Sequence, residues 1–464
     1  MMNARAETQS QASPGRHPSA LKLALTGLAA ASIEWYDFFI YATAAALVFP
    51  TQFFPASLPQ FVALVASFST FAVGFLARPL GAVLFGHLGD RAGRRATLAT
   101  AMILMGTVST LIGCLPTYNV AGAWSAFALV VLRFAQGLAV GGQWGGAILL
   151  STESAPASAR GWFGSIAQAG VPVGLVLANL AFIFAGNAMS SAAFLAYGWR
   201  IPFWLSLVLV ALGLYVRFGL QDTVAFARVA PGASAPQPAD SGASAPPVAR
   251  SSPVLEALRL YPGVIARAAG AYLSINIAFY IYIAYVVAYA TSAAGLGMPR
   301  TSVLLTSVIA SVCSAPALFA AGALSDRLGR RRLLLAGIGL AGAWGFVAFR
   351  LLESRSLGWI AFALSVGACL QSLAYGPIAA YFAELFETRV RYSAVSLAYQ
   401  IASIFGGGLA PVIAAALYAR FHDNTWIAGY IAVASVISFL CTLSLTETRD
   451  RDLDAVAASP RPDR

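Results

Sequence analysis

Long apolar stretches alternate with short polar, arginine-bearing connections along most of this chain. An α-helix of about 20 apolar residues crosses a bilayer core about 30 Å thick. Stretches of about this length lie on both sides of a polar gap. They predict twelve membrane-spanning helices, over 23–48, 61–85, 97–115, 124–150, 162–186, 201–219, 264–290, 302–323, 333–352, 357–382, 392–418 and 426–445.

The polar gap over residues 221–262 is rich in Pro, Ala, Ser and Gly, a composition typical of a flexible linker. It predicts two six-helix bundles joined by a linker. The expected divisions are an N-terminal tail over 1–22, bundles over 23–220 and 263–446, the linker, and a C-terminal tail over 447–464. The first twenty residues show no cleavable signal pattern, so we expect the first apolar stretch to remain as an anchor.

The composition excludes a soluble enzyme, a disordered regulator and a secreted disulfide-rich scaffold, and leaves an integral membrane protein. Hydrophobic residues make up 59% of the chain and charged residues 10%, whereas soluble domains carry about 25% charged residues. Most arginines lie in alternate connections, so the positive-inside rule puts these connections and both termini in the cytoplasm. This topology explains the net charge of +11 without nucleic acid. The cysteines show no metal-site or disulfide spacing; they are Cys114, Cys313, Cys369 and Cys441.

The two halves carry the same landmarks in the same order. Residues 86–95 read GHLGDRAGRR after the second span, and residues 322–331 read GALSDRLGRR after the eighth. The pair Glu153 and Arg160 recurs with equal spacing as Glu384 and Arg391. Parallel six-helix repeats around a central cavity are the plan of a major facilitator transporter.

Ionisable residues inside predicted spans are functional candidates because a charge in lipid is costly. Glu34 and Asp37 are three residues apart and share one helix face near mid-depth. A buried carboxylate can retain a proton, so both are predicted to couple transport to protons. Arg133 offers a bidentate fork to a substrate carboxylate; a permanent ion pair with Asp37 is the alternative. Arg78 is either a second anion contact or part of a structural ion pair.

Neutral polar residues complete the predicted substrate site. Gln136, Gln143 and Trp144 follow Arg133 along its helix. Further candidates lie in mid-span, namely Gln168, Asn276, Tyr280, Gln371 and Tyr375. Hydrogen bonds between helices are the alternative role for each of these side chains.

Finer motifs indicate a family. The segments are 34–38 (EWYDF), 77–81 (ARPLG), 133–137 (RFAQG), 141–146 (GGQWGG), 198–203 (GWRIPF) and 388–393 (TRVRYS). With the doubled D-R-x-G-R-R segment they resemble the metabolite:proton symporter family of the major facilitator superfamily. That family includes shikimate, α-ketoglutarate, citrate and proline/betaine carriers. Gln143 stands where the family usually has Glu, and an amide carries no titratable proton, so the resemblance implies no proton role there.

The resemblance implies an all-α membrane protein with two pseudo-symmetric bundles of six helices. It implies proton-coupled symport of a small organic acid, shikimate-like or a di- or tricarboxylate, by alternating access. Symport of a zwitterionic osmolyte such as proline or betaine is the alternative. In the superfamily, charged loops latch the cytoplasmic side. The corresponding residues here are Asp90, Arg91, Arg94, Arg95, Glu153, Arg160, Asp326, Arg327, Arg330, Arg331, Glu384 and Arg391; an alternative role is topological anchoring.

Other functions fit less well. A membrane enzyme would need a catalytic constellation, and the three histidines, His17, His87 and His422, lie outside the predicted spans. An ATP-driven pump would need a G-x-x-x-x-G-K-[ST] loop, which the chain lacks. We therefore expect a monomeric transporter of the bacterial inner membrane. Its partners would be a small molecule, protons and lipid, and it would bind no metal, cofactor or nucleic acid.

Overall fold

The computed structural model describes residues 20–92, 94–141, 144–153, 155–219, 253–388 and 390–451. Within these ranges every regular element is a helix. Nine of the described helical segments are long and apolar enough to cross a membrane, and Ala99–Cys114 forms a shorter apolar helix. The protein is therefore a multi-pass helical membrane protein, as the sequence predicts.

The N-terminal half contains eleven α-helices among the described residues, with 3₁₀ turns at Ala157–Ala159 and Gly198–Arg200. They are α1 (Ala20–Leu47), α2 (Phe49–Gln52), α3 (Gln60–Ala92), α4 (Arg94–Cys114), α5 (Tyr118–Ala121), α6 (Ala123–Val140), α7 (Trp144–Glu153), α8 (Arg160–Gln168), α9 (Gly170–Asn187), α10 (Ser191–Ala196) and α11 (Ile201–Gly219).

The C-terminal half follows the same plan. It comprises α13 (Pro253–Leu260), α14 (Pro262–Tyr280), the π-helix η3 (Ile281–Tyr285), α15 (Val286–Thr291), α16 (Arg300–Leu328), α17 (Arg330–Glu353), α18 (Leu357–Leu385), α19 (Arg391–Ser403), the π-helix η4 (Ile404–Gly408), α20 (Leu409–Phe421) and α21 (Thr425–Leu443). Each of the twelve predicted spans is helical over most of its described residues, with turns at Gly141 and Ala169 inside the fourth and fifth spans. The domain boundaries remain a prediction, since 1–19, most of the linker and 452–464 lie outside the described residues.

The repeated D-R-x-G-R-R segments differ from the loops that the sequence suggests. Helix α3 continues to Ala92 and α16 to Leu328, so both motifs are largely helical. In the second motif the break is the single residue Gly329, whose φ is +100°. An L side chain rarely adopts this backbone conformation, so glycine allows α16 to end and α17 to begin without a longer loop.

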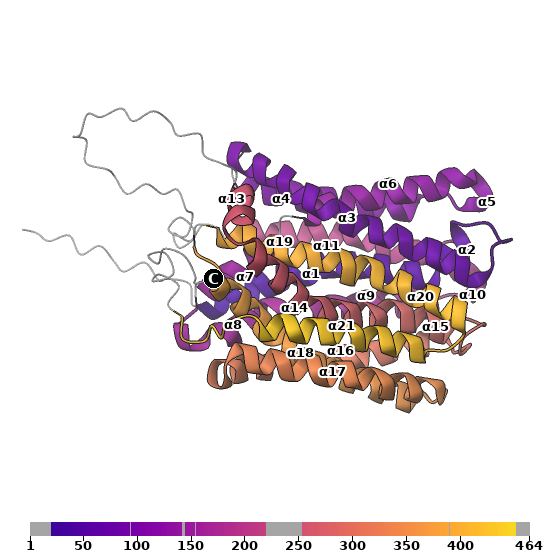
Figure 1. Ribbon diagram of the computed structural model, residues 1–464. Coiled ribbons are helices and arrows are strands. Elements are labelled where there is room, and N and C mark those ends of the chain that lie inside the picture. Colours follow the sequence, from indigo (N-terminus) through magenta and orange to yellow (C-terminus); the bar gives the residue numbers. More distant parts are fainter. Residues whose placement is uncertain are drawn as a thin grey trace, which may run out of the picture.

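The long helices lie side by side and define two ends of the molecule (Figure 1). We call the end that holds α7, α8 and α13 the motif end, and the end that holds α2, α5 and α10 the opposite end. Both D-R-x-G-R-R motifs lie at helix termini, and Asp326 of the second contacts α8 at the motif end.

Helices α3 and α6 approach closely through small residues. Gly137 on α6 and Gly141, which caps the end of α6, form a G-x-x-x-G pattern. A Cβ at Gly137 would lie 2.8 Å from the Cβ of Ala77 and 2.9 Å from the carbonyl carbon of Gly74. Small residues permit such backbone contact, which supplies packing energy in lipid. This crossing brings Arg78 on α3 close to Arg133 on α6.

Candidate functional site

A buried network joins Asp37 to Arg133 through one amide. The Gln136 Nε2 donates to Asp37 Oδ2 at 3.0 Å, and Arg133 Nη1 donates to Gln136 Oε1. Ser109 Oγ donates to the same Asp37 oxygen at 2.6 Å. We call these four residues the Asp37 network. The described residues contain no direct ion pair between Asp37 and Arg133, because Gln136 lies between them.

Aromatic rings enclose the Arg133 guanidinium. Its Cζ lies 4.1 Å from the ring centre of Tyr41, 4.8 Å from that of Phe71 and 4.9 Å from that of Phe38. The side chain is 1% exposed, and its Nε and Nη2 have no partner among the described residues. A Cβ at Gly74 would lie 2.6 Å from Nε, so glycine there makes room for the guanidinium. The cage stabilises a cation that has unused donors.

Arg78 faces a cavity that also contains a carboxylate. Its Cζ lies 4.3 Å from the ring centre of Phe75 and 4.9 Å from that of Phe38. The charged cavity, as we call it, is lined by Glu34, Trp35, Phe38, Arg78, Gln168, Tyr375, Tyr399 and Gln400, among others. Phe38 therefore lines this cavity and contacts both guanidinium groups.

Two glutamines present acceptors to the charged cavity. Gln168 Nε2 donates to the carbonyl of Tyr375 at 2.6 Å, and Gln400 Nε2 donates to that of Gly141 at 3.0 Å. These bonds fix the amide orientations, because only nitrogen can donate to a carbonyl. The Oε1 atom of each glutamine is buried without a described partner. The cavity therefore combines a guanidinium, a carboxylate and unused amide oxygens.

A second cavity lies mainly within the C-terminal half. Its lining includes Trp35, Tyr272, Asn276, Tyr280, Tyr282, Ser307, Ser311, Ser314, Gln371, Ser372, Tyr375 and Tyr399. No lining residue is Asp, Glu, Lys, Arg or His, so we call it the uncharged cavity. Trp35, Tyr375 and Tyr399 line both cavities and form the boundary between them.

The predicted substrate residues fall into three groups. Arg78, Gln168 and Tyr375 line the charged cavity, and Asn276, Tyr280, Gln371 and Tyr375 line the uncharged one. Arg133 and Gln136 line neither and belong to the Asp37 network. Gln143 lies outside the described residues, as does the side chain of Trp144.

Several residues that line the cavities or contact Asp37 are not predicted as site residues from the sequence. Tyr399 and Gln400 carry no distinguishing sequence pattern, and Tyr282 resembles a packing or interface aromatic in the sequence. Ser307, Ser311 and Ser314 do have a usable signal, because spacings of four and three residues mark one helix face. Ser109 lies alone in an apolar span, and only the fold brings it to Asp37.

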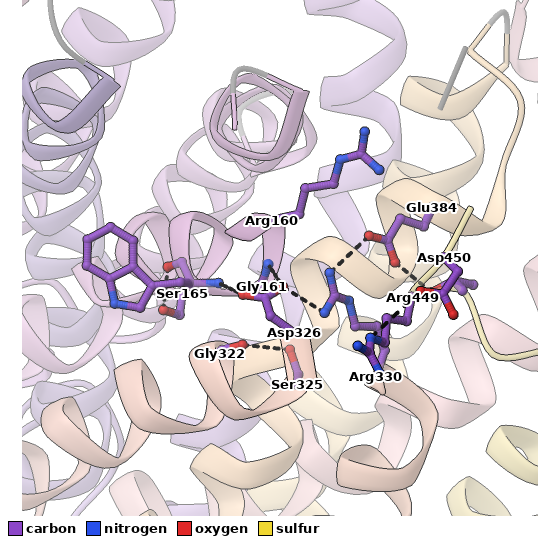
Figure 2. A network of polar contacts seen from close by, with 12 residues as sticks. Arg160, Gly161, Ser165, Gly322, Ser325, Asp326, Arg330, Glu384, Arg449 and Asp450 are labelled. Carbon is purple, nitrogen blue, oxygen red and sulfur yellow. Dashed lines mark hydrogen bonds and ion pairs between the residues drawn. The ribbon is translucent and has the colours of Figure 1, made fainter. Parts of the chain in front are cut away.

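At the motif end, Asp326 connects the two halves (Figure 2). Its Oδ1 accepts the backbone N–H of Gly161 at 2.9 Å, and its Oδ2 accepts that of Trp162 at 3.0 Å. These donors lie at the start of α8, where unpaired N–H groups favour a carboxylate. Arg330 pairs with Asp326 at 2.7 Å and with Glu384 at 3.2 Å, so one guanidinium links both carboxylates.

Further contacts at the motif end also cross between the halves. Arg391 pairs with Glu153 at 2.8 Å, and Arg160 donates to the carbonyl of Arg451 at 3.1 Å. Arg331 instead donates to carbonyls at the end of α21, and Arg327 is exposed. The side chains of Asp90, Arg91, Arg94 and Arg95 lie outside what the structure describes.

The halves also meet at the opposite end. Thr301 Oγ1 donates to Asn187 Oδ1 at 2.9 Å, and Arg300 Cζ lies 4.0 Å from the ring centre of Phe194. The rings of Phe61 and Tyr418 are 4.9 Å apart. Contacts therefore join the halves at both ends of the molecule.

Comparison with known proteins gives the same fold and a family. Residues 23–233 match the sugar (and other) transporter family, and residues 269–462 match the Major Facilitator Superfamily. A crystal structure of a D-xylose-proton symporter aligns with a TM-score of 0.70 at 19% identity, covering 93% of this chain and 99% of that one. The proton:xylose symporter XylE bound to 6-bromo-6-deoxy-D-glucose aligns with a TM-score of 0.69 at 17% identity. The alignment covers 95% of this chain and 98% of that one. These structures share the fold.

Closer relatives are bacterial transporters. The inner membrane metabolite transport protein YhjE of Escherichia coli K12 is 37% identical over 435 residues, covering 93% of this chain and 95% of the relative. The shikimate transporter of the same strain is 37% identical over 436 residues, with the same coverage. The proline/betaine transporter of that strain is 31% identical over 422 residues, covering 91% and 82%. The chain belongs to the major facilitator superfamily and is a membrane transporter of the metabolite-transporting group that includes these proteins, not an enzyme.

Proposed function

We propose that this protein is a proton-coupled symporter of a small organic acid, working by alternating access in the bacterial inner membrane. The observation that carries the proposal is that Arg78 lines a cavity near a buried Asp37: the Phe38 ring contacts both Arg78 and Arg133, and Gln136 links Arg133 to Asp37. The motif end is the cytoplasmic end in this proposal, since the arginine-rich connections belong inside.

Asp37 is the proposed proton carrier. Its Oδ1 is buried without a described partner, while Oδ2 already accepts two hydrogen bonds. Such a carboxyl has room for a proton on the oxygen that lacks a donor. Glu34 lines the charged cavity and is the second candidate; its place beside the substrate suits proton exchange with the cavity.

Arg78 is the proposed contact for the substrate carboxylate. Its guanidinium is permanently charged and offers paired donors that match a carboxylate. Arg133 is shielded by its aromatic cage and lines neither cavity, so its proposed role is to act on Asp37 through Gln136. This assignment differs from the sequence-based prediction that Arg133 binds the substrate.

Electrostatics then couples proton to substrate. The positive charges of Arg78 and Arg133 favour the ionised form of Asp37. An anion bound at Arg78 cancels part of that positive potential and makes protonation of Asp37 more favourable. By linkage, a protonated Asp37 strengthens anion binding equally. The two ligands therefore bind together, which is the requirement for symport.

The Asp326 contacts are the proposed cytoplasmic latch. Asp326 joins the halves through two backbone donors of α8, and Arg330 holds Asp326 in place within the C-terminal half. Arg391 with Glu153 adds a second pair across the halves, in which the arginine is buried. Opening the cytoplasmic side requires these contacts to separate. Exposed ion pairs contribute little singly, so the buried members of the network carry most of the latch energy.

A zwitterion is the second candidate substrate. The charged cavity places Glu34 and the unpartnered oxygens of Gln168 and Gln400 beside Arg78. An ammonium group would bind these acceptors while a carboxylate binds Arg78. The proline/betaine transporter among the relatives makes this alternative concrete.

Uptake into proteoliposomes with an imposed pH gradient, acid outside, tests the proposal. Labelled organic acids should accumulate above equilibrium, and dissipating the gradient should abolish the accumulation. Accumulation of betaine or proline, with no organic acid transported, would overturn the proposal in favour of the zwitterion.

A further inference from the structure

The uncharged cavity contrasts with its neighbour in electrostatic character. Glu34 and Arg78 both line the charged cavity, whereas the uncharged cavity has no formally charged side chain. A negative group placed there would be buried without a counter-charge, which is strongly unfavourable. The cavity therefore suits a neutral part of a ligand.

Unused polar atoms face this neutral space. Asn276 Nδ2, Tyr282 Oη and Ser307 Oγ have no hydrogen-bond partner among the described residues, although each residue is less than 9% exposed. Buried polar groups are normally hydrogen-bonded. Three such groups on one cavity indicate that a ligand supplies their partners.

The serines along α16 and α18 add acceptors. Ser311 donates its hydroxyl hydrogen to the carbonyl of Ser307 at 2.9 Å, and Ser314 donates to that of Ser311 at 2.8 Å. Ser372 donates to the carbonyl of Ala368 at 2.8 Å. Once that hydrogen is used, each hydroxyl can only accept. The wall thus accepts hydrogen bonds from ligand hydroxyls, while Asn276 donates to their oxygens.

We infer that the uncharged cavity binds the neutral, hydroxylated body of a monocarboxylate whose single carboxylate lies at Arg78. The inference rests on the proposed function and narrows it, because dicarboxylates and tricarboxylates would bury a second charge in a cavity without a cation. Ser307 and Asn276 become the specificity-determining residues for the hydroxyl groups.

The test measures how strongly unlabelled acids inhibit the uptake of a labelled organic acid by the full chain in proteoliposomes. The probes are hydroxylated monocarboxylates (shikimate, quinate), the deoxygenated cyclohexanecarboxylate, and the dicarboxylates malate and α-ketoglutarate. A hydroxylated acid should compete about 10- to 100-fold better than the deoxygenated acid, since lost hydrogen bonds leave buried groups unsatisfied. Dicarboxylates should compete at least about 100-fold more weakly.

Variants separate a binding role from a structural one. Ser307→Ala and Asn276→Ala should lower the apparent affinity for a hydroxylated acid about 10-fold. The apparent affinity for cyclohexanecarboxylate should stay unchanged. The exposed Ser69→Ala and Asn119→Ala are the matched controls. Equal loss for both acids, or dicarboxylates competing as well as hydroxylated monocarboxylates, would overturn the inference while the organic-acid function stands. If only betaine or proline competes, the proposed function itself fails.

Discussion

The Asp326 carboxylate accepts the backbone N–H of Gly161 at 2.9 Å, although the two residues belong to opposite halves of the chain. The space is tight, because a Cβ at Gly161 would lie 2.5 Å from the carbonyl oxygen of Gly322. Glycine at both positions lets α8 and α16 meet closely enough for this bond. The contact is therefore sensitive to charge and to volume.

Asp326→Asn should loosen the motif end. The amide can still accept a backbone hydrogen bond, but the charge that pairs with Arg330 and favours the α8 N-terminus is lost. A cysteine at Ile148, which lines the charged cavity, should be labelled about 5-fold faster from the motif end in a cysteine-free background.

The matched control for the latch is Glu353→Gln. That carboxylate forms an exposed pair with Arg350 at 3.8 Å, and such pairs contribute little. Equal labelling rates for wild type, Asp326→Asn and the control would leave Asp326 with only an anchoring role.

Gly137→Ala should destabilise the protein by about 1–3 kcal/mol, because α3 and α6 would have to separate. Gly429→Ala is the comparison, since a Cβ there meets nothing within 4 Å. The measurement is the thermal unfolding midpoint in detergent. If both variants unfold at the same temperature, the close α3–α6 crossing is not a determinant of stability.

Gln136→Leu should abolish coupled accumulation, because it removes the amide that joins Asp37 to Arg133 and leaves both without that partner. We expect at least about a 10-fold loss of gradient-driven uptake, since unpairing a buried charged group costs more than 1.4 kcal/mol. Gln60→Leu, at an exposed position, is the control. Wild-type accumulation by Gln136→Leu would argue against the network.

The sequence predicts the fold more completely than the site. Apolar length predicts twelve spans, and nine described helical segments are long and apolar enough to cross a membrane, because lipid requires such length. The repeated motifs indicate the two halves. The positions of Asp37 and Arg78 are also foreseeable, since a charge in an apolar span is conspicuous. What the sequence does not reveal is which charged side chain reaches a cavity.

That distinction depends on rings and glycines remote in sequence. Arg133 is enclosed by Tyr41 and Phe71 of other helices, and Gly74 provides its space. An arginine with these neighbours cannot be told from a cavity-facing one without knowing how α1, α3 and α6 cross. For the same reason Gln136 is predictable as a polar mid-span residue but not as the link to Asp37.

Arg78→Lys and Arg133→Gln should fail differently. Lysine keeps the charge but loses the paired donors, so Arg78→Lys should raise the KM for the acid about 10-fold and leave the dependence on the pH gradient intact. Arg133→Gln should retain binding and exchange but lose accumulation, because Arg133 lines neither cavity. Uptake and binding assays on both variants check this. Loss of binding in Arg133→Gln alone would return the carboxylate contact to Arg133.

Asp37→Asn should separate exchange from accumulation. The amide preserves an acceptor for Ser109 but cannot carry a proton. Exchange of labelled substrate across the membrane should survive, since exchange does not require proton release, whereas accumulation should be lost. Asp423→Asn, in the exposed connection between α20 and α21, should transport like the wild type. An Asp37→Asn protein that still concentrates substrate would remove Asp37 as the essential carrier.

The most direct test of proton-coupled symport is the internal pH of proteoliposomes when the acid is added outside at equal pH on both sides. The wild-type protein should acidify the interior in step with labelled-acid entry, and protein-free liposomes correct for passive permeation. Asp37→Asn should show no protein-dependent acidification. Protein-dependent entry of the acid through the wild type without internal acidification would contradict proton-coupled symport.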